Sequence, residues 1–323
     1  MSEETTLVER VRGGLLGVAV GDALGVPVEG IRREKLAKNP VRDMLPARRW
    51  GLPAGTWSDD TSLTLCLAAS LAELGRLDLD DVGRRFVRWL DDAYWSPHGT
   101  AVGLGRTTRQ AIARLRRGVP AERAGGKGEW SNGNGSLMRI LPVAVFFANA
   151  SEEEVVNAAH RVSAITHAHP RSQMACGIYC LVAREALAGR KLNEALERGV
   201  AVADRLYRRA PFDGEREHFR WIWDLSILRE PEAAVRSTGY VVDTLEAAFW
   251  CVTKGKDFEE AVVTAVNLGG DTDTLGAVVG GLAGLAWAER AIPARWLEPL
   301  ARAEEIRAVA DRLAQRVAER GGG

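Results

Sequence analysis

The chain is poor in cysteine and has no excess of charge of either sign. Lys plus Arg and Asp plus Glu each number 43, so no global basic field attracts nucleic acid or an anionic membrane. The start of the chain, MSEETTLVER, is acidic and polar, unlike a secretion signal. We therefore expect a cytoplasmic monomer with no nucleic-acid or membrane partner. The cysteines show no CxxC pair and no zinc-finger spacing: Cys66, Cys176, Cys180 and Cys251.

Convincing alternating strands are also lacking, whereas apolar residues recur with helical periodicity along almost the whole chain. Leu63 to Leu74 predicts an apolar helix that ends at Gly75. A capping box begins at Ser151, and Pro170 predicts another helix start. No low-complexity linker and no fixed-period repeat divides the chain. The sequence therefore predicts one all-α domain, a compact multi-helix fold over residues 1–323.

Apolar runs long enough to cross a membrane are absent as well. The most apolar stretches, Leu15 to Val28 and Leu275 to Ala288, are too short or too rich in glycine for a membrane span. Glycines recur every four residues in and beside these stretches, which places them on one helix face. Such spacing marks dimerisation in membranes, but in a soluble bundle it predicts close helix packing. The glycines are Gly13, Gly17, Gly21, Gly276, Gly280 and Gly284.

Two acidic clusters stand where apolar helices begin: Ser58 to Thr61 (SDDT) and Asp271 to Thr274 (DTDT). Capping alone is one interpretation, because Asp and Ser bind free N–H groups at a helix start and complement its dipole. The other is a site for two divalent cations, since carboxylate and hydroxyl oxygens are ligands of hard cations. Neighbouring positions on a helix point about 100° apart, so an adjacent Asp pair reaches two ions more easily than it chelates one. This second interpretation requires the fold to bring the clusters together.

Several other motifs carry polar groups suited to chemistry. The turn from Asn134 to Ser136 can expose backbone N–H groups that cradle a phosphate, or it is only the entry to a helix. His167 and His169 are spaced as zinc ligands can be, but no third nitrogen or thiolate ligand is evident, which favours substrate contact or loop packing. Tyr240 is either a core residue or a platform for a sugar or base. Glu29 becomes a candidate only if its loop meets the acidic clusters.

The segments that carry these residues resemble the ADP-ribosylglycohydrolase family, which includes the hydrolase that reactivates ADP-ribosylated dinitrogenase reductase. They lie between Gly13 and about Trp296 and occur in the family's order. Each segment alone is weak, but together they make the resemblance strong. The resemblance implies an all-α fold with two divalent cations, Mg²⁺ or Mn²⁺, in a binuclear cleft. The segments are GDALGVPVEG, GTWSDDTSLTL, GNGSLMRILP, THAHPRS, STGYVVDTLEAAFW and NLGGDTDTLGAVVGGLAG.

The resemblance also implies a role for individual residues. The implied reaction cleaves the glycosidic bond of ADP-ribose attached to a protein side chain or small molecule, through an oxocarbenium-like transition state. The cations would orient ribose hydroxyls and lower the pKa of a bound water, and a carboxylate would act as general base. The implied metal ligands are Ser58, Asp59, Asp60, Asp271, Asp273 and Thr274. The implied catalytic residues are Glu29, Asp60 and Asp273, and the implied ADP-ribose pocket contains Asn134, Gly135, Ser136, His167, Tyr240 and Gly270.

One position departs from the family's pattern. Members that act on ADP-ribosylarginine often carry an acidic residue before a Thr-Thr pair, and alignment on Thr107-Thr108 puts Gly103 at that position. This favours O-linked ADP-ribose, a free ADP-ribose conjugate or another nucleoside-like substrate over an arginine linkage. Two alternatives stay open: a non-catalytic member that binds ADP-ribose, and a binuclear-metal hydrolase of another nucleotide or glycoside. The full set of oxygen ligands argues against the non-catalytic role.

Overall fold

The computed structural model describes residues 5–321, which form α-helices and short 3₁₀ helices but no β-strand. The prediction of an all-α fold is therefore confirmed for these residues. The α-helices are α1 (Leu7–Gly25), α2 (Arg33–Leu36), α3 (Asp59–Leu74), α4 (Leu79–Asp92), α5 (Arg106–Arg116), α6 (Ala121–Ala124), α7 (Leu141–Phe146), α8 (Glu152–Ala164), α9 (Pro170–Leu187), α10 (Leu192–Leu206), α11 (Arg220–Trp223), α12 (Val241–Lys254), α13 (Phe258–Asn267), α14 (Thr272–Trp287), α15 (Ala294–Leu297) and α16 (Ala303–Gly321). The 3₁₀ helices are η1 (Val26–Val28), η2 (Arg48–Trp50), η3 (Glu129–Ser131), η4 (Asn134–Arg139), η5 (Asp213–Phe219), η6 (Ser226–Arg229), η7 (Glu232–Ala234) and η8 (Glu289–Ala291).

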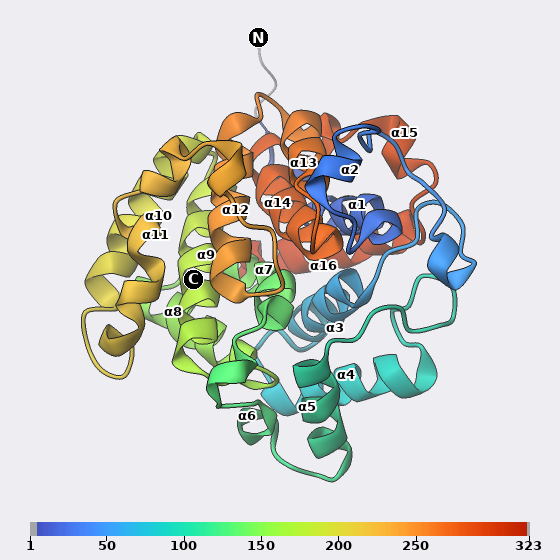
Figure 1. Ribbon diagram of the computed structural model, residues 1–323. Coiled ribbons are helices and arrows are strands. Elements are labelled where there is room, and N and C mark those ends of the chain that lie inside the picture. Colours follow the sequence, from blue (N-terminus) through green and yellow to red (C-terminus); the bar gives the residue numbers. More distant parts are fainter. Residues whose placement is uncertain (1–4, 322–323) are drawn as a thin grey trace.

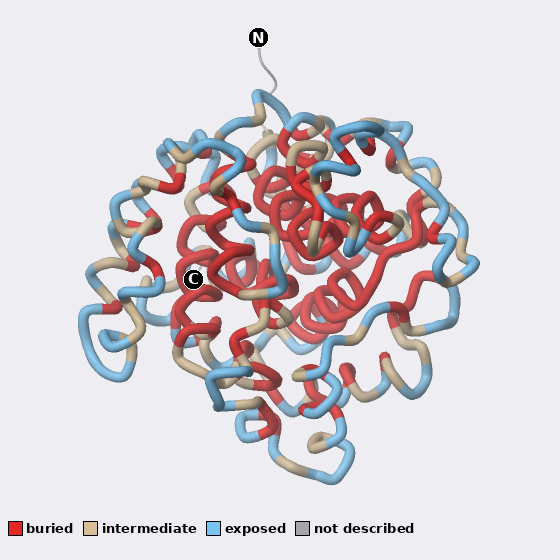
Figure 2. The backbone as a smooth tube through the Cα atoms, viewed as in Figure 1, coloured by how far each residue is buried: buried red, intermediate tan, exposed pale blue. Residues whose placement is uncertain are grey.

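Helices from opposite ends of the chain meet in the centre of the molecule. Figure 1 shows α1 beside α14, and both α1 and α3 also pack against α16. On one side α12 and α9 join this centre, with α8 and α10 packed outside α9. On another side α4 packs on α3 and carries α5 and α6. Figure 2 shows that buried backbone is concentrated in the central helices, while the connecting segments at the periphery are exposed.

The local signals that predicted helix ends are confirmed. α3 ends at Gly75, which adopts the left-handed conformation with φ of +63°. Ser151 forms a complete capping box at the start of α8, and Pro170 is the first residue of α9. α3 begins before the predicted Leu63, because Ser58 caps it by accepting a hydrogen bond from the N–H of Asp60. The acidic cluster therefore forms the first turn of the helix.

The prediction that each glycine-rich helix face packs closely against another helix is confirmed, and the structure shows that the two faces pack on each other. A Cβ atom on Gly21 of α1 would lie 1.9 Å from the carbonyl oxygen of Gly276 in α14. A Cβ atom on Gly280 would lie 2.1 Å from the carbonyl oxygen of Gly17. Only glycine permits this approach of two backbones, and it brings the last turn of α1 against the first turn of α14.

Within residues 5–321, one helical segment is long and apolar enough to cross a membrane. It is Leu7–Val28, 22 residues long, because the helix extends the apolar run from Leu15 towards the N-terminus. Of its most apolar window, 89% is buried inside the fold. This is the position of a core helix in a folded domain.

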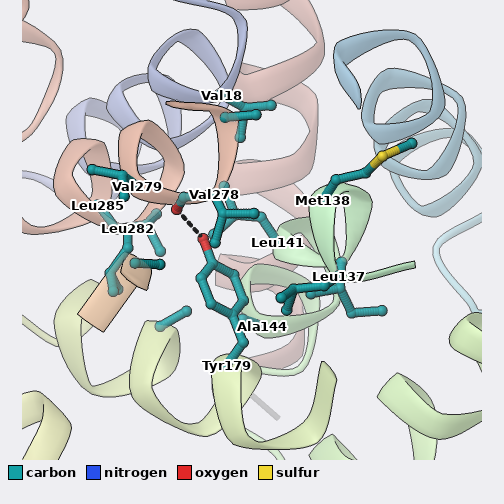
Figure 3. Close-up of a cluster of buried hydrophobic side chains, with 14 of the residues drawn as sticks. Val18, Leu137, Met138, Leu141, Ala144, Tyr179, Val278, Val279, Leu282 and Leu285 are labelled. Atoms are coloured by element: carbon teal, nitrogen blue, oxygen red, sulfur yellow. Dashed lines mark hydrogen bonds between the residues drawn. The ribbon is translucent and has the colours of Figure 1, made fainter. Parts of the chain in front are cut away.

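A hydrophobic cluster joins α7, α9 and α14 (Figure 3). The hydroxyl of Tyr179 on α9 donates a hydrogen bond of 2.9 Å to the carbonyl oxygen of Val278 on α14. Leu141 from α7 and Leu282 from α14 are buried in the same cluster. Burying a leucine side chain contributes about 1.5–3 kcal/mol. The cluster fixes α9 relative to α14, and the loop before α9 carries His167.

Candidate active site

The first turn of α3 is held by a carboxylate from the last turn of α1. Asp22 is fully buried and accepts hydrogen bonds from the backbone N–H groups of Ser58 (2.9 Å) and Thr61 (3.0 Å). It also accepts a hydrogen bond of 2.6 Å from the hydroxyl of Thr61. Asp22 was not among the predicted site residues. Its signal in the sequence is that it interrupts an apolar helical run, where a buried charge requires partners.

The structure brings the two acidic clusters together around Asp22. Carboxylate oxygens of Asp22, Asp60 and Asp273 lie within 4.8 Å of one another, and all three residues are buried. One oxygen of Asp60, Oδ2, accepts a hydrogen bond of 2.9 Å from the Ser58 hydroxyl. The other, Oδ1, is buried without a hydrogen-bond partner among residues 5–321. A group of carboxylates drawn from both clusters, with one oxygen left free, has the donor set that a hard divalent cation takes.

Burial raises the pKa of four carboxyl groups here, and repulsion between neighbouring carboxylates adds to the rise in three of them. Burial raises the pKa of Asp22 to about 6 and, with the charge of Asp22, that of Asp59 to about 7. The pKa values of Asp60 and Asp273 also lie well above the ordinary value, first through burial and then through the neighbouring aspartates. Like charges held this close in a buried site favour a cation between them.

The loop that carries Glu29 meets the acidic clusters. This was the condition for considering Glu29 a candidate site residue. The backbone N–H of Gly30 donates a hydrogen bond of 2.8 Å to the carbonyl oxygen of Gly270, next to the second cluster. Burial and the charge of Asp271 raise the pKa of Glu29. Oε2 of Glu29 lies 3.4 Å from Nη1 of Arg49, an exposed side chain at the edge of the site.

Gly103 lies directly against the first cluster. A Cβ atom on Gly103 would lie 2.1 Å from Oδ1 of Asp59, and the φ of Gly103 is +78°. The position where the sequence lacks an acidic residue therefore has no room for a side chain while Asp59 keeps its place. The segment that follows supplies cations instead, Arg106 and Arg109.

The glycine-punctuated turn is joined to the second cluster through Asn134. Nδ2 of Asn134 donates a hydrogen bond of 2.7 Å to Oδ2 of Asp271. The next residue is Gly135, where a Cβ atom would lie 2.8 Å from Cε1 of His167. Burial, and to a lesser extent the charge of Arg139, lowers the pKa of His167 to about 3, so the imidazole is neutral.

His169 has different partners from His167. Its Nδ1 accepts a hydrogen bond of 3.2 Å from the N–H of Arg171 and so caps α9. Its Nε2 lies 3.6 Å from Oε2 of Glu129. Both contacts hold the loop in place. They agree with loop packing, which was one of the two roles predicted for this residue in preference to zinc binding.

These segments enclose a cavity of about 600 Å³. Most of the predicted site residues line it: Glu29, Asp59, Asp60, Asn134, Gly135, His167, Asp271, Asp273 and Thr274. Other polar and aromatic residues that line it were not among the predicted site residues, and they include Arg49, Trp50, Arg106, Thr108 and Arg109.

Four predicted residues do not line this cavity. Ser58 donates its hydroxyl to Asp60 behind the surface, and the fully buried hydroxyl of Ser136 accepts a hydrogen bond of 2.9 Å from Ser163. Tyr240 is partly buried at the start of α12. Gly270 has a φ of +73°, and it turns the chain into the second cluster. Of the four, Ser58 and Ser136 are the buried residues that lie beneath the cavity wall.

Comparisons with known proteins agree over the whole chain. The model of a family described as ADP-ribosylglycohydrolase matches residues 3–323. A protein of Pseudomonas putida named ADP-ribosylarginine hydrolase Tri1 is 33% identical, over 96% of this chain and 79% of that protein. The ADP-ribosyl-[dinitrogen reductase] glycohydrolase of Rhodospirillum rubrum is 32% identical over 90% of each chain. A solved structure titled ADP-ribosylglycohydrolase-related protein complex has a TM-score of 0.80 and 36% identity, and covers 96% of this chain and 99% of its own.

Proposed function

The chain belongs to the ADP-ribosylglycohydrolase family, and on that premise we propose that it hydrolyses the glycosidic bond of ADP-ribose attached to a protein side chain or a small molecule. The names of its relatives, an ADP-ribosylarginine hydrolase and an ADP-ribosyl-[dinitrogen reductase] glycohydrolase, support this reaction class. The observation that carries the proposal is the buried carboxylate cluster at the floor of a cavity of about 600 Å³. Such a volume lies within the usual range for small-molecule sites.

We propose that this floor holds two divalent cations, Mg²⁺ or Mn²⁺. The free buried oxygen of Asp60 and the raised pKa values of the surrounding carboxyl groups are the features that fit cations. Ser58 is better placed to orient Asp60 than to bind an ion, because its hydroxyl donates to that carboxylate. When bound, the cations would supply Lewis acidity and orient ribose hydroxyls. The residues proposed to hold them are Asp59, Asp60, Asp271, Asp273 and Thr274.

We propose Glu29 as the proton acceptor of the reaction. It lines the same cavity as the clusters, and burial with the charge of Asp271 makes it a stronger base than an exposed glutamate. Its side chain keeps about a third of its surface exposed (37%), so water reaches it. The carboxylates below it would stabilise the positive charge that develops at the anomeric carbon as the glycosidic bond breaks.

Glu29→Gln is expected to lower turnover by about 100-fold or more, because it removes the general base, while cation affinity stays within a few-fold of the wild-type value. Turnover is measured by release of free ADP-ribose and cation affinity by calorimetry. Glu34→Gln, on the exposed face of α2 outside the cavity, is the matched control and should change neither quantity. Wild-type turnover in Glu29→Gln would remove Glu29 from the mechanism.

We propose that the preferred linkage is to a neutral or anionic group rather than to arginine. Gly103 has no side chain to pair with a guanidinium, and Arg49, Arg106 and Arg109 place positive charge around the cavity. A cationic leaving group is repelled by these side chains, whereas an O-linked one is not. The name of the Pseudomonas putida relative favours the opposite preference, so the two linkages must be compared directly.

Serine-linked or O-acetyl ADP-ribose is expected to be cleaved about tenfold faster than arginine-linked ADP-ribose at equal concentration, for the electrostatic reason just given. The measurement is free ADP-ribose released from each substrate side by side. Faster release from the arginine-linked substrate would contradict the preference without contradicting the hydrolase.

A further inference from the structure

A buried chain of hydrogen bonds leads from an arginine to the imidazole of His167. Arg139, in η4, is fully buried, and its Nη2 donates a hydrogen bond of 2.7 Å to Oγ1 of Thr166. Oγ1 of Thr166, also fully buried, lies 2.7 Å from Nδ1 of His167. No other hydrogen-bond partner of this hydroxyl occurs among the described residues.

The donors and acceptors in this chain decide which nitrogen of His167 carries the proton. Arginine has only donors, so Thr166 accepts from Arg139. A threonine hydroxyl also has one hydrogen to donate. If Nδ1 of His167 carried a proton, that hydroxyl hydrogen would be buried without an acceptor, at a cost of about 1–3 kcal/mol. The hydroxyl therefore donates to Nδ1, and in a neutral imidazole the proton then sits on Nε2.

The Nε2 atom faces the cavity at the glycine-punctuated turn. Cβ atoms built on Gly133 and Gly135 would lie 3.6 Å and 3.3 Å from it. His167 lines the cavity, and its Nε2 has no protein partner among residues 5–321. The low pKa of His167 keeps the ring neutral at physiological pH. An N–H group held in this position offers a hydrogen bond to an acceptor oxygen of whatever enters the cavity.

We infer that Arg139 and Thr166 are positioning residues, which fix His167 as an Nε2–H donor towards an acceptor oxygen of the bound ligand. The identity of that ligand as ADP-ribose rests on the proposed function, whereas the proton position does not. Arg139 also bonds the carbonyl oxygen of Gly135 and lies over the ring of Phe86 at 5.0 Å, so its removal would disturb the turn itself. Thr166 is therefore the better residue to change.

The test compares Thr166→Val, which removes the hydroxyl at nearly equal volume, with Thr166→Ser, which keeps it. The first readout is the ¹⁵N NMR shift of the His167 ring nitrogens in ¹⁵N-histidine-labelled protein, assigned with His167→Gln. The wild type and Thr166→Ser should show a protonated Nε2 and an unprotonated Nδ1, and Thr166→Val should show a mixture of tautomers. The second readout is ADP-ribose affinity, expected to fall about tenfold in Thr166→Val, the scale of one hydrogen bond, and to be rescued in Thr166→Ser.

The outcomes separate this inference from the proposed function. A protonated Nδ1 in the wild type, or an unchanged proton position in Thr166→Val, overturns the positioning role. A changed proton position with unchanged affinity overturns the role of His167 as the ligand's donor. If the wild type binds no ADP-ribose, the proposed function fails, and the NMR shifts alone still decide where the proton sits.

Discussion

Asp273→Asn is expected to abolish high-affinity binding of divalent cations and to lower turnover by about 1,000-fold or more, while the helical fold is retained. Asp273 shares its oxygen cluster with Asp60 and Asp22, so one amide in its place removes a charged ligand at the centre of the site. Loss of a cation that would orient the ribose hydroxyls and lower the pKa of the attacking water costs several kcal/mol, which is about three powers of ten in rate. Asp60→Asn is expected to have the same effect.

The same substitution, Asp273→Asn, is expected to raise the stability of the metal-free protein although it lowers activity. Burial, and after it repulsion from neighbouring carboxylates, raises the pKa values of Asp60 and Asp273. A neutral amide removes part of that repulsion, so metal-free Asp273→Asn should unfold at a higher temperature than the metal-free wild type. Added Mn²⁺ should stabilise only the wild type, because a ligand that binds the native state raises its stability.

The control for Asp273→Asn is Asp81→Asn, on α4 and outside the cavity. Asp81 is also largely buried, and it binds Arg85 (2.7 Å) and Ser70 (2.7 Å). Its replacement should lower stability through lost ion pairing but leave cation affinity and turnover unchanged. Equal turnover in Asp273→Asn and the wild type would contradict the two-cation site.

Gly21→Ala is expected to lower the free energy of unfolding by about 3 kcal/mol or more, the upper range for overpacking a core. The added Cβ would lie 1.9 Å from the carbonyl oxygen of Gly276 and 2.3 Å from its carbonyl carbon. Backbone atoms inside a helix cannot turn away, so α1 and α14 must separate. Because Asp22 follows Gly21 directly, the same shift displaces the carboxylate that holds the start of α3.

Gly14→Ala on the same helix is the matched control for this prediction. The nearest atoms to its Cβ would be side-chain atoms of Leu285, at 2.6 Å, and of Leu141, at 3.3 Å, and a side chain can change rotamer. Alanine is also favoured over glycine inside a helix by about 1 kcal/mol, which offsets part of the strain. Chemical denaturation of both variants measures the difference. An equally small loss in Gly21→Ala would mean that backbone contact between α1 and α14 does not limit the packing.

Much of this fold could be predicted from sequence because its signals are local or periodic. Glycines at every fourth position mark a helix face whatever it packs against, so the close packing of the helices that contain Gly21 and Gly280 could be foreseen. Capping at Ser151 depends only on the next three residues. The sequence did not show that the two glycine faces pack on each other, because periodicity identifies a face and not its partner.

The site was predicted in outline because its signals are also local in the sequence. Adjacent acidic and hydroxyl residues at two helix starts are visible along the chain, but their grouping in space is not. From the sequence, each acidic cluster was expected to supply its own group of metal ligands. In the structure, Asp60 of the first cluster and Asp273 of the second lie together with Asp22 in a single group of carboxylates. Arg49 lies in the short 3₁₀ helix η2 and Arg106 is the first residue of α5. A surface arginine at such a position carries no signal in the sequence that it faces a cavity.

The most direct test of the central claim is release of free ADP-ribose by protein stripped of metal and then given Mg²⁺ or Mn²⁺. Arginine-linked, serine-linked and O-acetyl ADP-ribose are offered side by side, with Asp273→Asn as the inactive control. We expect no release without metal, release from at least one substrate when metal is restored, and none from the variant. Release that does not depend on metal, or no release from any substrate with metal bound, would contradict a two-cation ADP-ribosyl hydrolase.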